Sequence, residues 1–235
     1  MESIRKAARL TGGVYLAVVI SGIFVLMYVP GRLFVTDNAA ATVNNILAHQ
    51  TLFRAYIIVG VISELLFITV VLLLYRLLED VHQLLAMIMV LLVLLIAPLA
   101  FLSAMNQVAT LAFVRGDALL NVFDKPQRDA LATLLIANDQ TGTLIAEIFW
   151  GLWLLPLGTL VFRSGFLPRF LGVWLIINGL AYLVISMTGL LLPQYVHTVF
   201  LAAQPALMGE LALTLWLLIV GARAPRSAPQ TEVVV

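Results

Sequence analysis

Three glutamates lie within long apolar stretches of this chain, and apolar packing alone does not explain an acidic side chain there. Glu147 and Glu210 share one pattern, in which the Glu is followed after four residues by Leu-Trp-Leu-Leu and, two residues later, by a Gly. Glu64 lies in a third stretch. A carboxylate in the middle of a membrane-spanning helix is costly, which favours positions that face the protein interior. The pattern therefore indicates a centre that could hold a proton, a cation or a small polar ligand.

These polar residues are also expected at similar depth. At 1.5 Å per residue, Glu64 and Glu210 lie roughly 18 Å from Arg76 and Arg223, which is near the middle of a ~30 Å hydrocarbon core. Asn178 falls in the same slab. If the carboxyls meet in a low dielectric they cannot all ionise, and at least one should keep its proton. The open alternative is that protonated glutamates simply hold neighbouring helices together. The candidate ligand- or proton-binding residues are Glu64, Glu147, Glu210 and Asn178.

Composition places these residues in a membrane protein. Of the 235 residues 63% are hydrophobic and 11% are charged, whereas a soluble domain carries about 25% charged residues. Six apolar runs are long enough to cross a bilayer. They are residues 10–29, 52–75, 84–105, 142–162, 170–191 and 200–221. We therefore predict an all-α integral membrane six-helix bundle, with a single domain over 1–223 and a disordered cytoplasmic tail at 224–235.

The positions of Lys and Arg set the expected orientation, because positively charged loops resist translocation. If the N-terminus is cytoplasmic, eight of the 13 Lys and Arg residues fall on the cytoplasmic side and five on the other. Both termini are therefore predicted in the cytoplasm. Short extracytoplasmic helices are predicted in the first and third loops, at 37–50 with Asp37 as cap and at 124–139 with Asp124 as cap. A polar stripe on the first is either a solvated face or a lid on the bundle, and its residues are Asn38, Thr42, Asn45 and His49.

Polar residues at the outer ends of the spans form a second group of candidates. Arg54 is a natural cationic partner for an acid near that surface, and Asn106 and Gln107 add hydrogen-bonding capacity. The outer-mouth candidates are His49, Arg54, Asn45, Asn106 and Gln107. We predict no cofactor. We also predict no metal, because the only metal candidates are His49 and His197, and two widely separated loop histidines do not make a site on their own.

Several classes of protein are excluded by what the chain lacks. With no Cys it has no disulfide, no thiolate metal site and no cysteine nucleophile. A net charge of +1 without a basic cluster excludes a nucleic-acid partner. No hydrolase, metalloprotease or nucleotide-binding motif is present, so no catalytic residue is named.

Small residues and prolines predict how the helices pack. Gly13, Ala17 and Ser21 repeat every four residues, and Gly172, Gly179 and Ser186 every seven, which favours close helix contacts. Kinks are predicted at Pro98, Pro156 and Pro205.

Several short strings carry a resemblance to a known family. The most specific is Arg-Ser-Gly-Phe-Leu-Pro-Arg at 163–169 with Leu-Gly at 171–172, and others are Leu-Tyr-Arg-Leu-Leu at 74–78 and Phe-Trp-Gly-Leu-Trp-Leu at 149–154. Over residues 5–223 the chain resembles the bacterial multi-pass family called domain of unknown function 4386. The resemblance implies a six-span protein of the bacterial cytoplasmic (inner) membrane. It supplies no substrate, reaction or catalytic residue.

Three functions stay open. The first is a protein that binds or transports a proton, cation or small polar solute through the acids. The second is a structural or accessory membrane protein, in which the acids are protonated contacts between helices. The third is a membrane enzyme with His49, Arg54 and His197 at an outer-face site. The predicted partners are the lipid bilayer and a small polar or cationic ligand. A homo-oligomer also stays open, because six spans are few for a monomeric transporter.

Overall fold

Six long helices dominate the fold. The structure, a computed structural model, describes residues 2–35, 38–117, 120 and 122–222, and the predicted tail at 224–235 lies outside this part of the chain. All regular elements in the described residues are helices, which confirms the predicted all-α six-helix architecture. The helices long and apolar enough to cross a membrane are Ile4–Leu33, Gln50–Leu78, Gln83–Arg115, Lys125–Arg163, Arg169–Leu191 and Pro193–Ile219.

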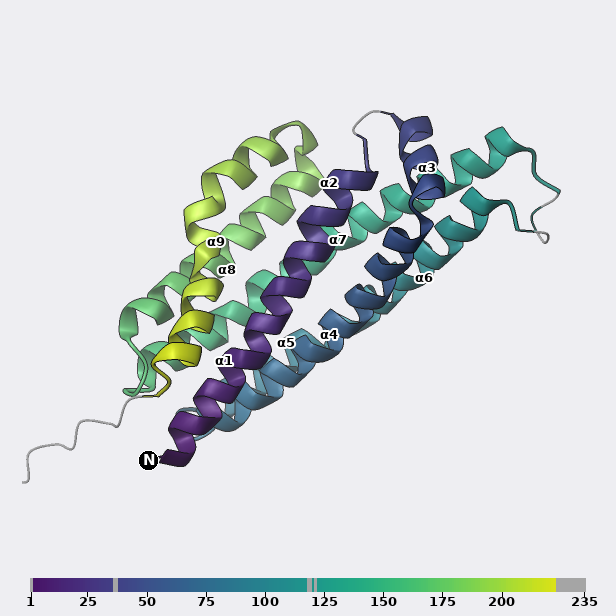
Figure 1. Cartoon of the computed structure of the whole chain (residues 1–235). Coiled ribbons are helices and arrows are strands. Elements are labelled where there is room, and N and C mark those ends of the chain that lie inside the picture. Colours follow the sequence, from purple (N-terminus) through teal and green to yellow (C-terminus); the bar gives the residue numbers. More distant parts are fainter. Residues whose placement is uncertain (1, 36–37, 118–119, 121, 223–235) are drawn as a thin grey trace, which may run out of the picture.

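The two described ends of the chain lie at the same end of the bundle (Figure 1). The Arg9 guanidinium donates a 3.0 Å hydrogen bond to the carbonyl of Ile219, and Gly221, which has φ +75°, lies against Arg5. We call this the terminal end and the opposite one the distal end. The predicted cytoplasmic location of the terminal end stays a prediction.

The first span contains a wide turn that its sequence does not signal. It consists of α1 (Glu2–Ile23), the π-helix η1 (Phe24–Tyr28) and α2 (Val29–Leu33). A π-helix places one extra residue in its turn, so the two flanking segments present different faces. Tyr15 of α1 packs into the larger apolar core, whereas Leu33 of α2 packs into a separate cluster at the distal end.

A short helix, α3 (Ala39–Ala48), follows at the distal end. Its cap is Asn38, whose side chain accepts a 2.9 Å hydrogen bond from the backbone of Ala41. The predicted cap, Asp37, lies outside the described residues.

The polar stripe of α3 is solvated only in part, because Asn38 and His49 are exposed whereas Thr42 is buried and Asn45 is half-buried. The Thr42 hydroxyl accepts a 2.9 Å hydrogen bond from the backbone of Val35, and the Asn45 amide donates to the carbonyl of Leu33 at 3.3 Å. These side chains fasten α3 to the segment that leads into it.

The second and third spans are α4 (Gln50–Leu78) and the pair α5 (Gln83–Leu94) and α6 (Ala97–Arg115). The third span is interrupted at residues 95–96. Pro98 lacks a backbone N–H and its ring clashes with the preceding turn, so the helix cannot run through it unchanged. The kink predicted there is confirmed as a break.

The fourth span, α7 (Lys125–Arg163), is one helix of 39 residues. Asp124 and Gln127 form a reciprocal capping box, as the predicted start at Asp124 requires. The separate outer helix predicted at 124–139 is instead the first part of α7. Only Gly142 interrupts the helical composition near the expected boundary, and a single Gly is not enough to end a helix.

The most extensive helix contact joins α7 to α8 (Arg169–Leu191). A Cβ on Gly151 would lie 2.6 Å from the carbonyl oxygen of Gly179, and a Cβ on Gly158 would lie 2.7 Å from that of Gly172. The predicted close face at Gly172 and Gly179 is confirmed.

The last span comprises η3 (Pro193–Tyr195) and α9 (Val196–Ile219), and α9 bends along its length in Figure 1. It packs against α1 through Gly12, whose added Cβ would meet the Leu218 backbone nitrogen at 2.4 Å. The predicted contact at Gly13 is looser, with 3.9 Å to the Leu218 side chain.

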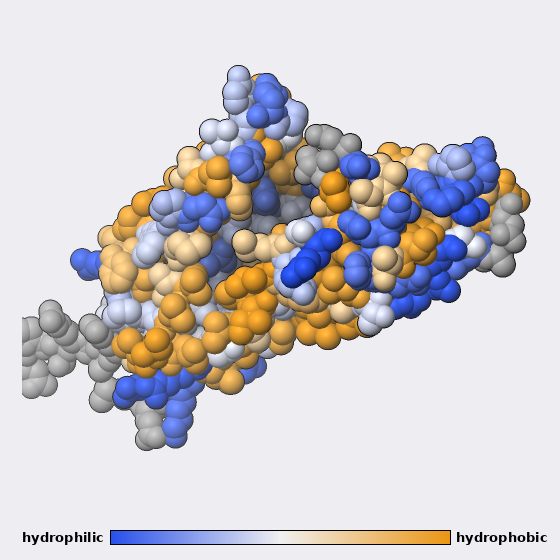
Figure 2. Space-filling model, turned by 45° about the horizontal axis from the view of Figure 1, so that its top comes forward, coloured by the Kyte–Doolittle hydropathy of each residue, from blue (hydrophilic) through white to orange (hydrophobic). Residues whose placement is uncertain are grey.

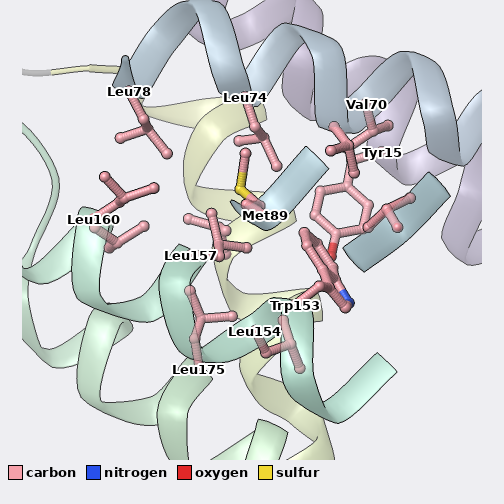
Figure 3. Packing of buried hydrophobic residues seen from close by; sticks show 14 of the residues in the cluster. Tyr15, Val70, Leu74, Leu78, Met89, Trp153, Leu154, Leu157, Leu160 and Leu175 are labelled. Atoms are coloured by element: carbon pink, nitrogen blue, oxygen red, sulfur yellow. The ribbon is translucent and has the colours of Figure 1, made fainter. Parts of the chain in front are cut away.

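Two apolar clusters fill the interior. The larger one surrounds Trp153 and Leu157 in the terminal half (Figure 3). There the Phe67 and Trp153 rings meet edge to face with centres 5.1 Å apart. The smaller one, around Ile46 and Phe53, lies at the distal end. The polar side chains described next lie between these two clusters along α4, α6 and α7.

Candidate functional site

A cavity of about 150 Å³ lies between α1 with η1, α4, the start of α6 and α7. Most of its wall is apolar. The polar side chains that line it are Tyr56, Ser63, Glu64, Ser103, Gln107 and Thr143, and Trp150 adds an indole ring. None of the lining residues is Lys, Arg or His. In Figure 2, orange, hydrophobic residues cover much of the middle of the molecule, whereas blue, hydrophilic residues gather toward its ends.

Irregular helix geometry shapes this cavity. Val25 and Leu26 of the π-helix line it, and so does Ile96 at the break of the third span. The π-helix and the break both divert a helix from its regular path, and π-helices are frequent at functional sites. Glycines leave further room, because a Cβ on Gly60 or Gly142 would meet no atom within 4 Å.

Glu64 is the acid of this cavity. It is only 8% exposed, and among the described residues its Oε1 atom has no hydrogen-bond partner. Burying a carboxyl oxygen without a partner costs free energy, so such atoms in native proteins call for an explanation. A lining position gives one, because a ligand in the cavity can supply the partner. Next to it, Ser63 and Ser21 are joined by a 2.9 Å hydrogen bond between α4 and α1.

Asp139 of α7 organises the distal wall. Its carboxylate accepts hydrogen bonds from the Ser103 hydroxyl, from the Gln107 amide at 3.0 Å and from the Tyr56 hydroxyl. The Gln107 amide also donates to Ser103 Oγ at 3.0 Å. Asp139 thus ties together α4, α6 and α7 while its partners, and not Asp139 itself, line the cavity.

Sequence reasoning named Gln107 but not Asp139 among the candidates. The sequence predicts Asp139 at the end of the short outer helix at 124–139, because the fourth span is expected to begin at residue 142. The spacing of Asp139 and Thr143, four residues apart on one helix face, was the available signal.

Glu147 and Glu210 gather around Tyr182 instead of lining the cavity. Glu210 accepts a 2.6 Å hydrogen bond from Tyr15 and is also bonded to Tyr182 and Asn178. Glu147 lies close enough to Tyr182 for an electrostatic interaction, and its Oε2 atom has no partner among the described residues.

The expected meeting of all three glutamates in one cavity is therefore not what the structure has. Trp150 stands between the two groups, since it lines the cavity and packs edge to face against Tyr182 with ring centres 5.9 Å apart. Asn178 is fully buried and donates to the Leu207 carbonyl at 3.3 Å. It belongs to the group around Tyr182.

The outer-mouth candidates are scattered. Gln107 alone among them lines the cavity. His49 and Arg54 are exposed at the distal end, and Asn45 fastens α3. The side chain of Asn106 is half-buried beside Gln107 but does not line the cavity.

His197, the other metal candidate, is exposed on α9. Within the described part of the chain, no three His, Asp or Glu side chains come close enough together to hold a metal ion. His49 and His197 therefore have no set of three metal-ligating side chains around them in that part of the chain.

The comparisons with known proteins give a family and no function. No curated protein and no solved structure matches the chain. The model of one protein family matches residues 10–221, which is most of the chain. This multi-pass membrane protein belongs to the family described as Domain of unknown function (DUF4386).

Proposed function

We propose that this membrane protein binds a proton, cation or small polar solute in the cavity that Glu64 lines, and that it transports this solute. The observation that carries the proposal is a nine-tenths buried carboxyl oxygen without a partner at the wall of a cavity of about 150 Å³. Cavities of roughly this size hold a molecule as large as benzene. A charge-bearing residue inside a membrane protein is by default a functional-site hypothesis.

Glu64 and Glu210 then have different roles. Glu64 binds the solute, whereas Glu210 holds helices together through Tyr15 and Tyr182. The second role supports the alternative of a structural or accessory protein for that half of the molecule only. No contact of this kind accounts for the free oxygen of Glu64.

The same proposal includes a location. We place the protein in the bacterial cytoplasmic membrane with both termini in the cytoplasm, supported by the eight-to-five distribution of Lys and Arg. The cavity then lies in the outer half of the bilayer, next to the distal cluster.

Binding to the purified protein in lipid nanodiscs tests the function. Heats of binding are measured for sodium, potassium, ethylammonium, glycerol, urea and acetone, on the unmodified protein, on Glu64→Gln and on Glu79→Gln. Glu79 is a matched control because it ends α4 outside the cavity. At least one solute should bind the unmodified protein and Glu79→Gln alike, and Glu64→Gln about tenfold or more weakly, as expected for a lost charge-assisted contact. Equal binding of every solute to all three proteins would refute the proposal.

A further inference from the structure

We infer that the ligand of the Glu64 cavity is a small organic ammonium ion, a cation that donates N–H bonds and carries a short hydrocarbon part. This inference rests on the proposed function and specifies the chemical class of the solute. It follows from a count of which hydrogen-bonding groups in the wall are already used.

The donors of the distal wall are all directed away from the ligand. A glutamine amide has two N–H donors, and Gln107 gives one to Asp139 and the other to Ser103. The only donor of Ser103 and the only donor of Tyr56 also go to Asp139. Asp139 and Ser103 together therefore take up every donor that these three lining side chains possess.

The remaining lining hydroxyl of α7 is used in the same way. Thr143 donates to the backbone carbonyl of Asp139 at 3.1 Å. What Tyr56, Ser103, Gln107 and Thr143 can still offer is acceptor capacity on their oxygens.

Glu64 adds an acidic oxygen to this set of acceptors. No basic side chain lines the cavity, so nothing in the wall complements a ligand that carries negative charge, and the lining donors without an acceptor among the described residues are the Ser63 hydroxyl and the Trp150 indole N–H. A ligand that donates N–H bonds and carries a positive charge fits the Glu64 carboxyl and the acceptor oxygens of the distal wall. Hydrogen bonds from a cation to such a carboxylate are among the stronger ones in proteins.

The rest of the wall favours an organic cation over a metal ion. Ca²⁺ takes six to eight oxygen ligands and Mg²⁺ an octahedral set, whereas this cavity is mostly apolar. Alkyl groups can lie on that apolar surface. The Trp150 and Tyr56 rings that line the cavity can attract the cationic end, since a ring face attracts ammonium groups.

Asp139 acts in this scheme as a positioning residue. In Asp139→Asn one carboxylate oxygen becomes an amide that must donate, so at least one partner has to turn its own hydrogen elsewhere. A donor then becomes available to the cavity. Ethylammonium should bind less well and acetone, which only accepts hydrogen bonds, should bind better.

The panel of solutes described above separates the two proposals. We expect ethylammonium to bind and to lose about tenfold or more in affinity in Glu64→Gln, with acetone binding the unmodified protein measurably but at least about tenfold more weakly than ethylammonium. In Asp139→Asn the ratio of the two dissociation constants should shift by about tenfold toward acetone, which a loss of general stability would not produce.

Each other outcome has a distinct meaning. If glycerol, urea or a metal cation binds in a Glu64-dependent way and ethylammonium does not, the ammonium inference is wrong and the cavity proposal stands. If ethylammonium binding is insensitive to Glu64→Gln, the inference is wrong as well. An unchanged ratio in the folded Asp139→Asn protein would overturn the donor argument.

Discussion

Tyr15 of α1 donates a 2.6 Å hydrogen bond to Glu210 of α9. The bond joins the first and the last long helix, and its two residues lie 195 positions apart in the sequence. The bond lies at the end of a face where Gly12 lets the two backbones approach. Polar bonds between helices in lipid contribute about 0.6 kcal/mol on average and at most about 2 kcal/mol. Glu210 therefore stabilises the closure of the bundle by its first and last spans.

Replacing Glu210 tests this role. Glu210→Ala leaves the Tyr15 hydroxyl buried without an acceptor, and we expect a loss of about 1–3 kcal/mol in the free energy of unfolding. Glu210→Gln keeps an oxygen that can accept the bond, so it should lose less. Unfolding in detergent mixtures measures both, with Glu79→Ala as control. A Glu210→Ala protein as stable as the control would contradict the structural role.

Two glycines on the spans should respond oppositely to alanine. Gly60 lines the cavity with open space where a Cβ would lie, and an alanine in a helix is favoured over glycine by about 0.5–1 kcal/mol. Gly60→Ala should keep or raise stability and weaken solute binding. Gly179→Ala would place its Cβ 2.6 Å from the Gly151 carbonyl and should destabilise the fold. Thermal unfolding compares the two, and equal effects would argue against the close contact of α7 and α8.

Asp139→Ala should be far more harmful than Asp129→Ala on the same helix. Asp139 accepts from three side chains, and each donor left unsatisfied costs about 1–3 kcal/mol. Asp129 makes only an ion pair with Lys125 at 2.6 Å, four residues away, of a type that contributes about 0.3–0.5 kcal/mol. Unfolding of the two variants side by side measures the difference. Similar losses would mean that the Asp139 bonds do not hold the distal wall.

Orientation can be tested because the chain has no cysteine of its own. Single cysteines are placed at Gln83, exposed at the terminal end, and at Val122, which is 83% exposed at the distal end. In intact cells with the outer membrane made permeable, a maleimide that cannot cross the inner membrane should label the Val122→Cys protein. The Gln83→Cys protein should react only after lysis. The reverse pattern would place the termini outside the cytoplasm.

The helices could be predicted from sequence because a run of about 20 apolar residues is a strong and local signal. The rotation of each helix could not, since it depends on which neighbours it packs against. The repeated pattern of a Glu followed after four residues by Leu-Trp-Leu-Leu does group Glu147 with Glu210, and both lie near Tyr182. Glu64 was assigned to the same centre because depth can be counted along a sequence, whereas facing direction cannot.

For a related reason, the sequence does not indicate Asp139 as a candidate site residue. An aspartate after a polar stretch is typical of a loop, and only the uninterrupted α7 brings it to Ser103 and Gln107. Its importance depends on partners 32 and 36 residues away, which no local pattern reveals.

The wide turn at Phe24–Tyr28 holds one residue more than a regular helical turn would. One α-helical residue corresponds to about 100° of rotation, from 3.6 residues per turn. A regular helix of unchanged length would therefore rotate Val29 and Leu33 away from the distal cluster, whereas deleting one residue from the wide turn would make the helix regular and keep both side chains near their places. Natural variants of this chain should therefore tolerate the loss of one residue in this turn far better than the loss of one residue elsewhere in the first span.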